Sequence, residues 1–505
     1  MAADPAEGAG PPRPPAANKR LIVCCDGTWN DSISTDSPVT NVSRISRCIP
    51  GLSDTGVVQL VSYHTGVGSG TSKPGNIIDG MTGRGVSANI RDAYSFLCHN
   101  YLEDERNKDE IVLIGFSRGA FTVRSIASFM TDVGLLEKAG LNYMLKLYGL
   151  WSNQLSRKRE KDAMFPGIPP STPKIRMRRL CRLLEDRNLL RRGVKIKVCA
   201  VWDTVGSLGV PLPGPIPQRA SKKLAFVNSA LLENIDVAVQ ALALNEHRKH
   251  FQPTVWSTNS RTKLRQCWFL GAHSDVGGGY EDTGLANLTL VWMIAQLTEF
   301  VYFDHRALLH LASHKQIGST EKFVTKEREF GIGNIKNSVT GPFLLGGTKS
   351  RKPGQYLMNT HGLYRNPKTV PISTNETIHW TVRVLLGLGL RECPALRKYS
   401  TKLQNGTGIV WTLHSKGNVP RAVELREDEF CALEKDLLES WMKAEGYEQH
   451  AGANSGVSLG LFSEAKKYMS LSEILIPWLG ETQKPTVHFP ARVLLEPDEA
   501  ITVGS

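Results

Sequence analysis

One serine in this sequence stands in a pattern that suits a nucleophile. Ser117 lies within Gly115-Phe116-Ser117-Arg118-Gly119, after the apolar run 111–114 and before the helix-like run 121–130. A buried strand that turns sharply into a helix presents a serine hydroxyl at the tip of the turn. The flanking glycines matter because a side chain at either position would crowd that turn. The pattern therefore predicts that Ser117 attacks a carbonyl carbon.

A serine nucleophile needs a base to take its proton and an acid to orient the base. Asp203 follows the strand-like run 195–202, and His273 follows the strand-like run 267–270. The order Ser, Asp, His, each after a strand, is that of the α/β-hydrolases. We therefore predict a triad of these three residues. The alternatives are a packing serine in the turn, an aspartate that caps the next turn, and a histidine satisfied in the core.

Other residues compete for the same roles. His247 is a rival base, expected at the end of an amphipathic helix over residues 233–244. Asp236 and Asp275 are rival acids. Asp275 stands only two residues after His273, so we expect it to fix its own loop.

A loop after the first strand is the natural source of one oxyanion donor. The backbone N–H of Arg118, next to the nucleophile, should be the other donor. Gly27 or Thr28 supplies the second N–H in this prediction, unless Asp26-Gly27-Thr28 is an ordinary turn. Asp26 would be unfavourable there as a free anion, so its side chain should hydrogen-bond the loop backbone.

The elements that must position these residues alternate along the chain. Strand-like runs are expected at 21–25, 57–63, 111–114, 195–202 and 267–270, and helices at 86–102, 233–244 and 285–301. This alternation predicts an α/β fold with a mostly parallel sheet covered by helices on both faces. Chemistry in such sheets collects at the carboxyl ends of the strands, where the polar motifs lie.

The predicted domain organisation has three parts. Residues 1–18 are rich in Pro, Ala and Gly and form a disordered tail; residues 19–320 form the catalytic domain, with an insertion at about 135–193. Residues 321–505 form a helical and loop-rich region packed on that core.

Composition limits the class of protein. An apolar content of 41% and a charged content of 22% are typical of soluble globular chains. No signal-peptide core and no run of ~18 apolar residues are evident, so a cytoplasmic location is expected. The nine cysteines include no CxxC and read as reduced, buried residues. The glycine-rich stretches lack the phosphate-loop and dinucleotide patterns, so we expect no cofactor and no metal.

The net charge of +13 favours acidic partners, and the stretch 174–192 concentrates arginine between apolar residues. That stretch is either a solvated helix face or a helix that holds anionic lipid headgroups at a membrane surface. No nucleic-acid partner is expected. Two further alternatives stay open: a metal-dependent phosphoester hydrolase built from Asp26, Asp203, His273 and Asp275, and a non-catalytic protein that binds membranes through residues 174–192.

Four motifs together resemble a known family. They are Asp26-Gly27-Thr28-Trp29-Asn30, Gly115-Phe116-Ser117-Arg118-Gly119-Ala120, Trp202-Asp203-Thr204-Val205-Gly206 and the string from Gly271 to Tyr280. They resemble an α/β-hydrolase family long catalogued as a domain of unknown function, which includes the phospholipase effectors of bacterial type VI secretion and many fungal members. The resemblance covers roughly residues 20 to 310, and the tail composition is typical of a fungal member.

The resemblance implies an α/β-hydrolase fold and a Ser-Asp-His triad at Ser117, Asp203 and His273. It also implies hydrolysis of lipid acyl esters of the phospholipase A type. The main hypothesis is thus a serine esterase or lipase that acts on an ester or lipid substrate.

Overall fold

The computed structural model describes most of the chain between residues 18 and 436. The described residues are 18–27, 38–66, 84–104, 108–205, 224, 227, 230–304, 307, 334–359, 369–371, 373–387, 392–404, 408–413, 423–428, 434 and 436. The N-terminal tail expected at residues 1–18 lies almost wholly outside this set, as does Thr28.

Strands and helices alternate over the first 300 residues. The strands are β1 (Lys19–Cys25), β2 (Val58–His64), β3 (Glu110–Phe116), β4 (Leu135–Leu136), β5 (Leu190–Arg191), β6 (Ile196–Trp202), β7 (Ile235–Ala243), β8 (Lys263–Phe269), β9 (Leu357–Asn359), β10 (Thr369–Pro371), β11 (Glu376–His379), β12 (Tyr399–Gln404), β13 (Gly408–Leu413) and β14 (Val423–Asp428). The α-helices are α1 (Asn41–Arg47), α3 (Arg84–Asn100), α4 (Arg118–Asp132), α5 (Met144–Ser152), α6 (Pro173–Asp186), α7 (His273–Gly277), α8 (Gly284–Leu297) and α10 (Trp380–Gly387). Four 3-10 helices complete the described elements: η1 (Lys138–Tyr143), η2 (Lys249–Phe251), η3 (Gly341–Gly346) and η4 (Pro394–Leu396).

A single large sheet organises the described part of the chain. Its order is β12-β13-β14-β11-β8-β7-β6-β3-β1-β2. All neighbours from β2 to β14 are parallel, whereas the pairs β14–β13 and β13–β12 are antiparallel, so β13 is the strand of this sheet that runs in the opposite direction. The chain places β2 on one side of β1 and β3 on the other, so the strand order reverses there. Ligands bind at such switch points in α/β sheets, and the turn after β3 carries Ser117. The mostly parallel α/β sheet predicted from the sequence is confirmed.

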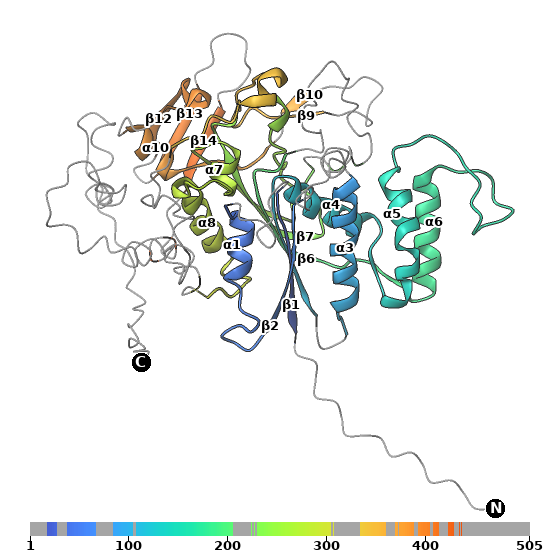
Figure 1. The fold of residues 1–505 in the computed structure, drawn as a ribbon. Helices are drawn as coiled ribbons and strands as arrows, with labels where there is room; N and C mark the ends of the chain where they lie inside the picture. The colour runs from blue at the N-terminus through green and yellow to red at the C-terminus, as the bar shows by residue number, and fades with distance from the viewer. Residues whose placement is uncertain are drawn as a thin grey trace, which may run out of the picture.

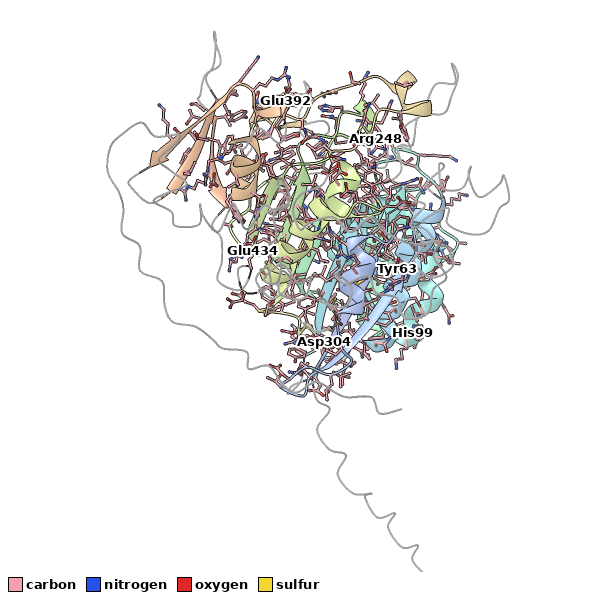
Figure 2. The ribbon with its side chains drawn as sticks, turned by 60° about the vertical axis from the view of Figure 1, so that its left-hand side comes forward. Tyr63, His99, Arg248, Asp304, Glu392 and Glu434 are labelled. Atoms are coloured by element: carbon pink, nitrogen blue, oxygen red, sulfur yellow. The ribbon has the colours of Figure 1, made fainter. Side chains whose placement is uncertain are left out.

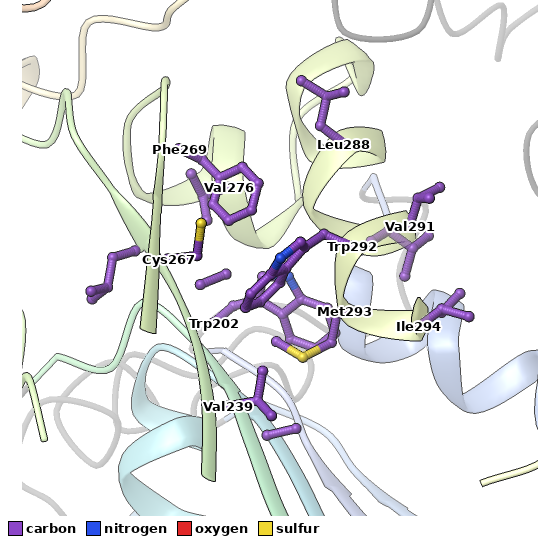
Figure 3. Close-up of a cluster of buried hydrophobic side chains, with 14 of the residues drawn as sticks. Trp202, Val239, Cys267, Phe269, Val276, Leu288, Val291, Trp292, Met293 and Ile294 are labelled. Carbon is purple, nitrogen blue, oxygen red and sulfur yellow. The ribbon is translucent and has the colours of Figure 1, made fainter. Parts of the chain in front are cut away.

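Helices cover both faces of the sheet (Figure 1). One face carries α1 and α8, and the other carries α3 and α4, with α5 and α6 outside them. Figure 3 shows how α8 packs: Trp292 and Met293 meet Trp202, Val239 and neighbouring side chains of the strands. Successive side chains along a strand point to opposite faces of the sheet, and helices cover both faces. The central strands are therefore continuously apolar in sequence.

The segment expected as an amphipathic helix over residues 233–244 is instead strand β7, and that prediction was wrong. Its residues from Val237 to Ala243 are all buried between the parallel neighbours β6 and β8. A strand buried on both faces shows no two-residue alternation, so its pattern does not separate it from a buried helix. His247 therefore follows a strand, and Asp236 lies at the amino end of that strand.

The region after residue 320 contributes strands to the main sheet, where the sequence suggested helices and loops. β11 pairs with β8, and β14, β13 and β12 extend the sheet from there. These strands are four to six residues long and lie at the sheet edge. Short strands carry a weak periodic signal, which is why the sequence pattern did not indicate them. The insertion near 135–193 begins and ends in the antiparallel pair β4–β5.

The eight cysteines described by the structure are free and buried, as the sequence predicted. Within the described residues, no helix is both long enough and apolar enough to cross a membrane.

Candidate active site

The turn between β3 and α4 holds Ser117 in a strained conformation. Its φ of 57° and ψ of −118° lie where side chains are rarely found. A Cβ on Gly115 would lie 2.7 Å from the Gly119 carbonyl oxygen, and one on Gly119 would lie 2.0 Å from that of Cys25. The two glycines are therefore required by close backbone approach, which is the geometry expected of a nucleophile elbow.

Three side chains from separate elements form one chain of hydrogen bonds. The Oγ of Ser117 lies 2.7 Å from Nε2 of His273, and Nδ1 of His273 lies 2.6 Å from Oδ2 of Asp203. Ser117 lies between β3 and α4, Asp203 follows β6, and His273 begins α7, so all three stand at the carboxyl end of the sheet. All three side chains are buried. The structure thus brings together the three residues that the sequence singled out.

A residue that the sequence analysis missed completes this arrangement. The guanidinium of Arg351 donates to both carboxylate oxygens of Asp203, at 2.8 and 3.0 Å, and to the carbonyl of Phe251 at 2.6 Å. Asp203 also accepts the backbone N–H of Ala243. Arg351 stands in a basic run, Lys349 to Lys352, with no neighbouring chemical motif. Local sequence therefore held no signal for its role.

Burial and charge set the protonation of the pair. Burial alone would raise the pKa of Asp203, but Arg351 and the His273 hydrogen bond hold that pKa well below its usual range. Burial lowers the pKa of His273 below its ordinary value, although the bond to Asp203 acts in the other direction. An ionised aspartate thus faces a neutral imidazole at neutral pH, which is the state in which Nε2 accepts a proton.

Residues around the imidazole hold it in place. The backbone N–H of His273 donates to Glu246, whose carboxylate is bidentate with Arg248. Arg248 lies over the ring of Phe251, which in turn meets the His273 ring edge-on. Figure 2 shows Arg248 at this end of the sheet, whereas His99 and Asp304 lie at the opposite end.

The loop after β1, in which an oxyanion donor was predicted, has a different arrangement from the one expected. The N–H of Gly27 donates to Oδ1 of its neighbour Asp26 at 2.6 Å. Asp26 is buried and also accepts from the hydroxyls of Thr40 and Tyr63. Its carboxylate is thus held by one loop amide and two side chains rather than by loop backbone alone. In this structure the Gly27 amide points at Asp26 and not at Ser117.

Asp275 fixes the loop that carries His273. Its Oδ2 accepts the N–H groups of Ala272 and Lys336. Burial raises the pKa of Asp275 to about 7. Nδ1 of His273 is bonded to Asp203, so the rival acid Asp275 is not the partner of the imidazole. The other rivals are also elsewhere: His247 contributes its carbonyl to Lys349, and Asp236 lies at the far end of β7.

The proposed metal ligands do not converge. Asp203 is occupied by Arg351 and His273, and Asp26 and Asp275 each hold their own loops. Within the part of the chain that the structure describes, no group of three or more His, Cys, Asp and Glu side chains is placed to hold a metal ion.

One family model matches the part of the chain that carries Ser117, Asp203 and His273. The model described as "T6SS, Phospholipase effector Tle1-like, catalytic domain" matches residues 19–296, more than half of the 505 residues. The chain belongs to this family. The family match spans Ser117, Asp203 and His273 but ends before Arg351.

Relatives of this Tle1-like chain include proteins from yeast and bacteria. Uncharacterized protein YEL023C of Saccharomyces cerevisiae is 24% identical over 422 residues, which cover 60% of this chain and 61% of that protein. A solved structure of an uncharacterized protein from Pseudomonas aeruginosa is 16% identical, with a TM-score of 0.28, and covers 56% of this chain and 46% of its own. The Tle1 effector bound to the VgrG spike of the type 6 secretion system is also 16% identical, with a TM-score of 0.29, and the match covers 53% and 52%. The chain thus spans about half to three fifths of these proteins.

Proposed function

We propose that this protein is a serine hydrolase that cleaves carboxylic esters, with lipid acyl esters as the substrate class. The observation that carries the proposal is the hydrogen-bonded chain from Ser117 through His273 to the ionised Asp203. Membership of a phospholipase effector family supports the choice of lipid.

Each of the three residues has a defined part in the reaction. Nε2 of His273 takes the proton from Ser117 as Oγ attacks the carbonyl carbon, and then gives it to the leaving alcohol. Asp203 holds Nδ1 and stabilises the imidazolium while that charge exists. Water then attacks the acyl-serine with His273 as base again, which releases the fatty acid and restores Ser117.

The oxyanion is stabilised in this proposal by the backbone N–H of Arg118, in the first turn of α4. First-turn amides have no acceptor within a helix and point along its positive end. Gly27 becomes the second donor only if its bond to Asp26 breaks when substrate binds. Supporting roles fall to Asp26 and Asp275, which hold the loops on either side of the triad.

A substrate panel tests this function directly. Phospholipids of several headgroups, monoacyl lipids and short p-nitrophenyl esters are incubated with the full chain, and released fatty acid or alcohol is measured. A fluorophosphonate probe, which reacts with activated serines, is applied in parallel. We expect turnover of acyl lipids and covalent labelling at Ser117. No turnover of any ester together with no labelling would overturn the proposal.

The rate should depend on pH through His273. Because burial lowers the pKa of this imidazole, we expect kcat/KM to fall on acidification with an apparent pKa below the ordinary value of about 6.5. Above that pKa the imidazole is neutral and accepts the Ser117 proton; below it the base is lost. The measurement is a pH profile of kcat/KM on a short, uncharged ester. An acid limb centred above pH 7 would contradict the assignment.

We further propose that the insertion contacts anionic membrane surfaces. The apolar side of α6 is buried in the core, so those side chains are not available to a bilayer. Its other side exposes Lys174, Arg178 and Arg182, and the preceding loop exposes four further basic side chains: Arg157, Lys158, Arg159 and Lys161. Exposed apolar side chains accompany them: Leu145, Leu155, Ile168 and Ile175. Basic charge beside exposed apolar side chains is typical of membrane-surface contact.

Charge reversal tests this contact. We expect Arg178→Glu with Arg182→Glu to weaken binding to vesicles that contain anionic phospholipid by roughly tenfold or more, because each basic residue at such a surface contributes about 1 kcal/mol. Vesicle co-sedimentation at two salt concentrations is the measurement. The matched control reverses two exposed lysines on another part of the chain, Lys398→Glu with Lys402→Glu. Equal losses in both pairs would mean that net charge alone drives binding.

A further inference from the structure

The segment 334–359 crosses the carboxyl end of the sheet and contacts the loops after β6, β7 and β8. Ser338 donates to Glu246, and the N–H of Lys336 donates to Asp275. Further along, the N–H of Lys349 donates to the carbonyl of His247. Figure 1 shows β9, the end of this segment, at the same end of the molecule as α7. We call residues 334–359 the strap.

Arg351 is the point at which the strap meets the triad. Its side chain has no exposed surface, and neither has that of Asp203. The bidentate pair with Asp203 and the bond to the Phe251 carbonyl use three separate N–H groups of one planar guanidinium. A planar fork matches both oxygens of a carboxylate, so it sets the orientation of the Asp203 carboxylate as well as its charge.

The charge of Arg351 should also reach the base through Oδ2 of Asp203, which accepts from both Arg351 and His273. A triad aspartate raises the pKa of its histidine because it stabilises the imidazolium. A cation that shares the same carboxylate opposes this, so the imidazole stays neutral to lower pH. The charges that act directly on His273 are Asp203 after β6 and Glu246 and Arg248 after β7, of which Arg248 lowers its pKa. Asp275 lies two residues along α7, and Arg351 on the strap acts on Asp203.

We propose that Arg351 is a positioning residue of the triad, supplied by the strap, which fixes the Asp203 carboxylate and keeps His273 a competent base at acid pH. This inference rests on the proposed serine-hydrolase function. It also means that the active site extends beyond residue 296, where the family match ends, and beyond the boundary expected near residue 320.

The test compares two buried arginines in the full chain. Arg351→Ala removes the partner of Asp203. Arg383→Ala removes another buried arginine, on α10, whose guanidinium is bidentate with Glu427 on β14. The rate of fluorophosphonate labelling is measured from pH 5 to pH 9, with melting temperature recorded for each variant. We expect Arg351→Ala to label about 10- to 100-fold more slowly and to move the acid limb up by roughly one pH unit. Arg383→Ala should leave the limb where it is.

Two additions separate charge from geometry. Arg351→Lys keeps the charge but lacks the fork, so it should keep the acid limb of the wild type while labelling slowly. Millimolar guanidinium should restore the labelling rate of Arg351→Ala and have no effect on Arg383→Ala. If Arg351→Ala does not fold, Arg351→Lys against Arg383→Lys carries the same comparison of rates. An unchanged limb in Arg351→Ala, with a loss of melting temperature equal to that of Arg383→Ala, would overturn the proposal.

A measurement without turnover separates this inference from the proposed function. The pKa of the His273 ring can be followed by NMR of ¹³C-labelled histidine, with His273→Gln to assign the signal. We expect that pKa to rise in Arg351→Ala. If the wild type neither labels nor turns over esters, the proposed function fails, and with it the assignment of Arg351 to catalysis, whereas the His273 titration still reports its electrostatic effect. If the wild type labels and the titration is unchanged, only the role of Arg351 fails.

Discussion

Ser117→Ala is expected to lower ester hydrolysis by about 10⁴- to 10⁶-fold, the loss typical of a removed triad nucleophile. The Oγ of Ser117 is the only side-chain oxygen of the described residues that the structure places on Nε2 of His273, at 2.7 Å. Without it, no acyl-enzyme forms and fluorophosphonate labelling disappears. The measurements are kcat/KM on the best ester of the panel and mass spectrometry of the labelled protein.

Ser125→Ala is the matched control for this loss. Ser125 lies two turns further along α4, is fully buried, and donates only to the carbonyl of Phe121. Its loss should leave labelling and hydrolysis within about twofold of the wild type, because the bond is local to the helix. Hydrolysis that survives Ser117→Ala at the level of Ser125→Ala would show that another group attacks the ester.

Gly119→Ala should destabilise the protein by about 3 kcal/mol or more and displace the elbow. A Cβ at this position would lie 2.0 Å from the carbonyl oxygen of Cys25 and 2.5 Å from that of Asp26. Both oxygens are backbone atoms: Cys25 is the last residue of β1 and pairs with β2 and β3, and Asp26 follows it and donates its N–H to the His64 carbonyl. Neither can move far without disturbing this pairing. Denaturant unfolding measures the loss, and the rate of Ser117 labelling measures the displacement.

Gly149→Ala gives the opposite expectation with the same chemical change. Gly149 lies within α5, and no atom lies within 4 Å of a Cβ built there. Alanine in a helix interior should therefore stabilise the protein by about 0.5–1 kcal/mol. If the two substitutions shift the unfolding midpoint alike, close approach of α4 to β1 is not the constraint at Gly119.

Much of the candidate site could be predicted because its parts are local. A nucleophile elbow needs an apolar strand, two glycines and a following helix, and these are contiguous around Ser117. Asp203 and His273 each follow a strand, and parallel strands bring their carboxyl ends to one edge. The order of elements was therefore enough to expect that Ser117, Asp203 and His273 lie close together. In the structure His273 is within hydrogen-bond distance of both other residues.

Other features depend on packing that no local pattern records. Strand β7 was expected as a helix because burial on both faces removes the alternation that distinguishes a strand. The N–H of Gly27 was expected to face an oxyanion, but a buried Asp26 needs donors and takes it. Each outcome follows from which groups the fold buries side by side.

By itself, the sequence determined the α/β class, the elbow at Ser117 and the identity of the residues that meet it. These follow from short-range rules: strand and helix periodicity, the steric needs of a tight turn, and the order of strands. Only the tertiary structure decided what surrounds Asp203. Arg351 is 148 residues away in the chain and reaches that carboxylate because the strap crosses the carboxyl end of the sheet. This buried ion pair forms only when two distant segments pack together, and neither segment has a local sequence pattern that predicts its partner.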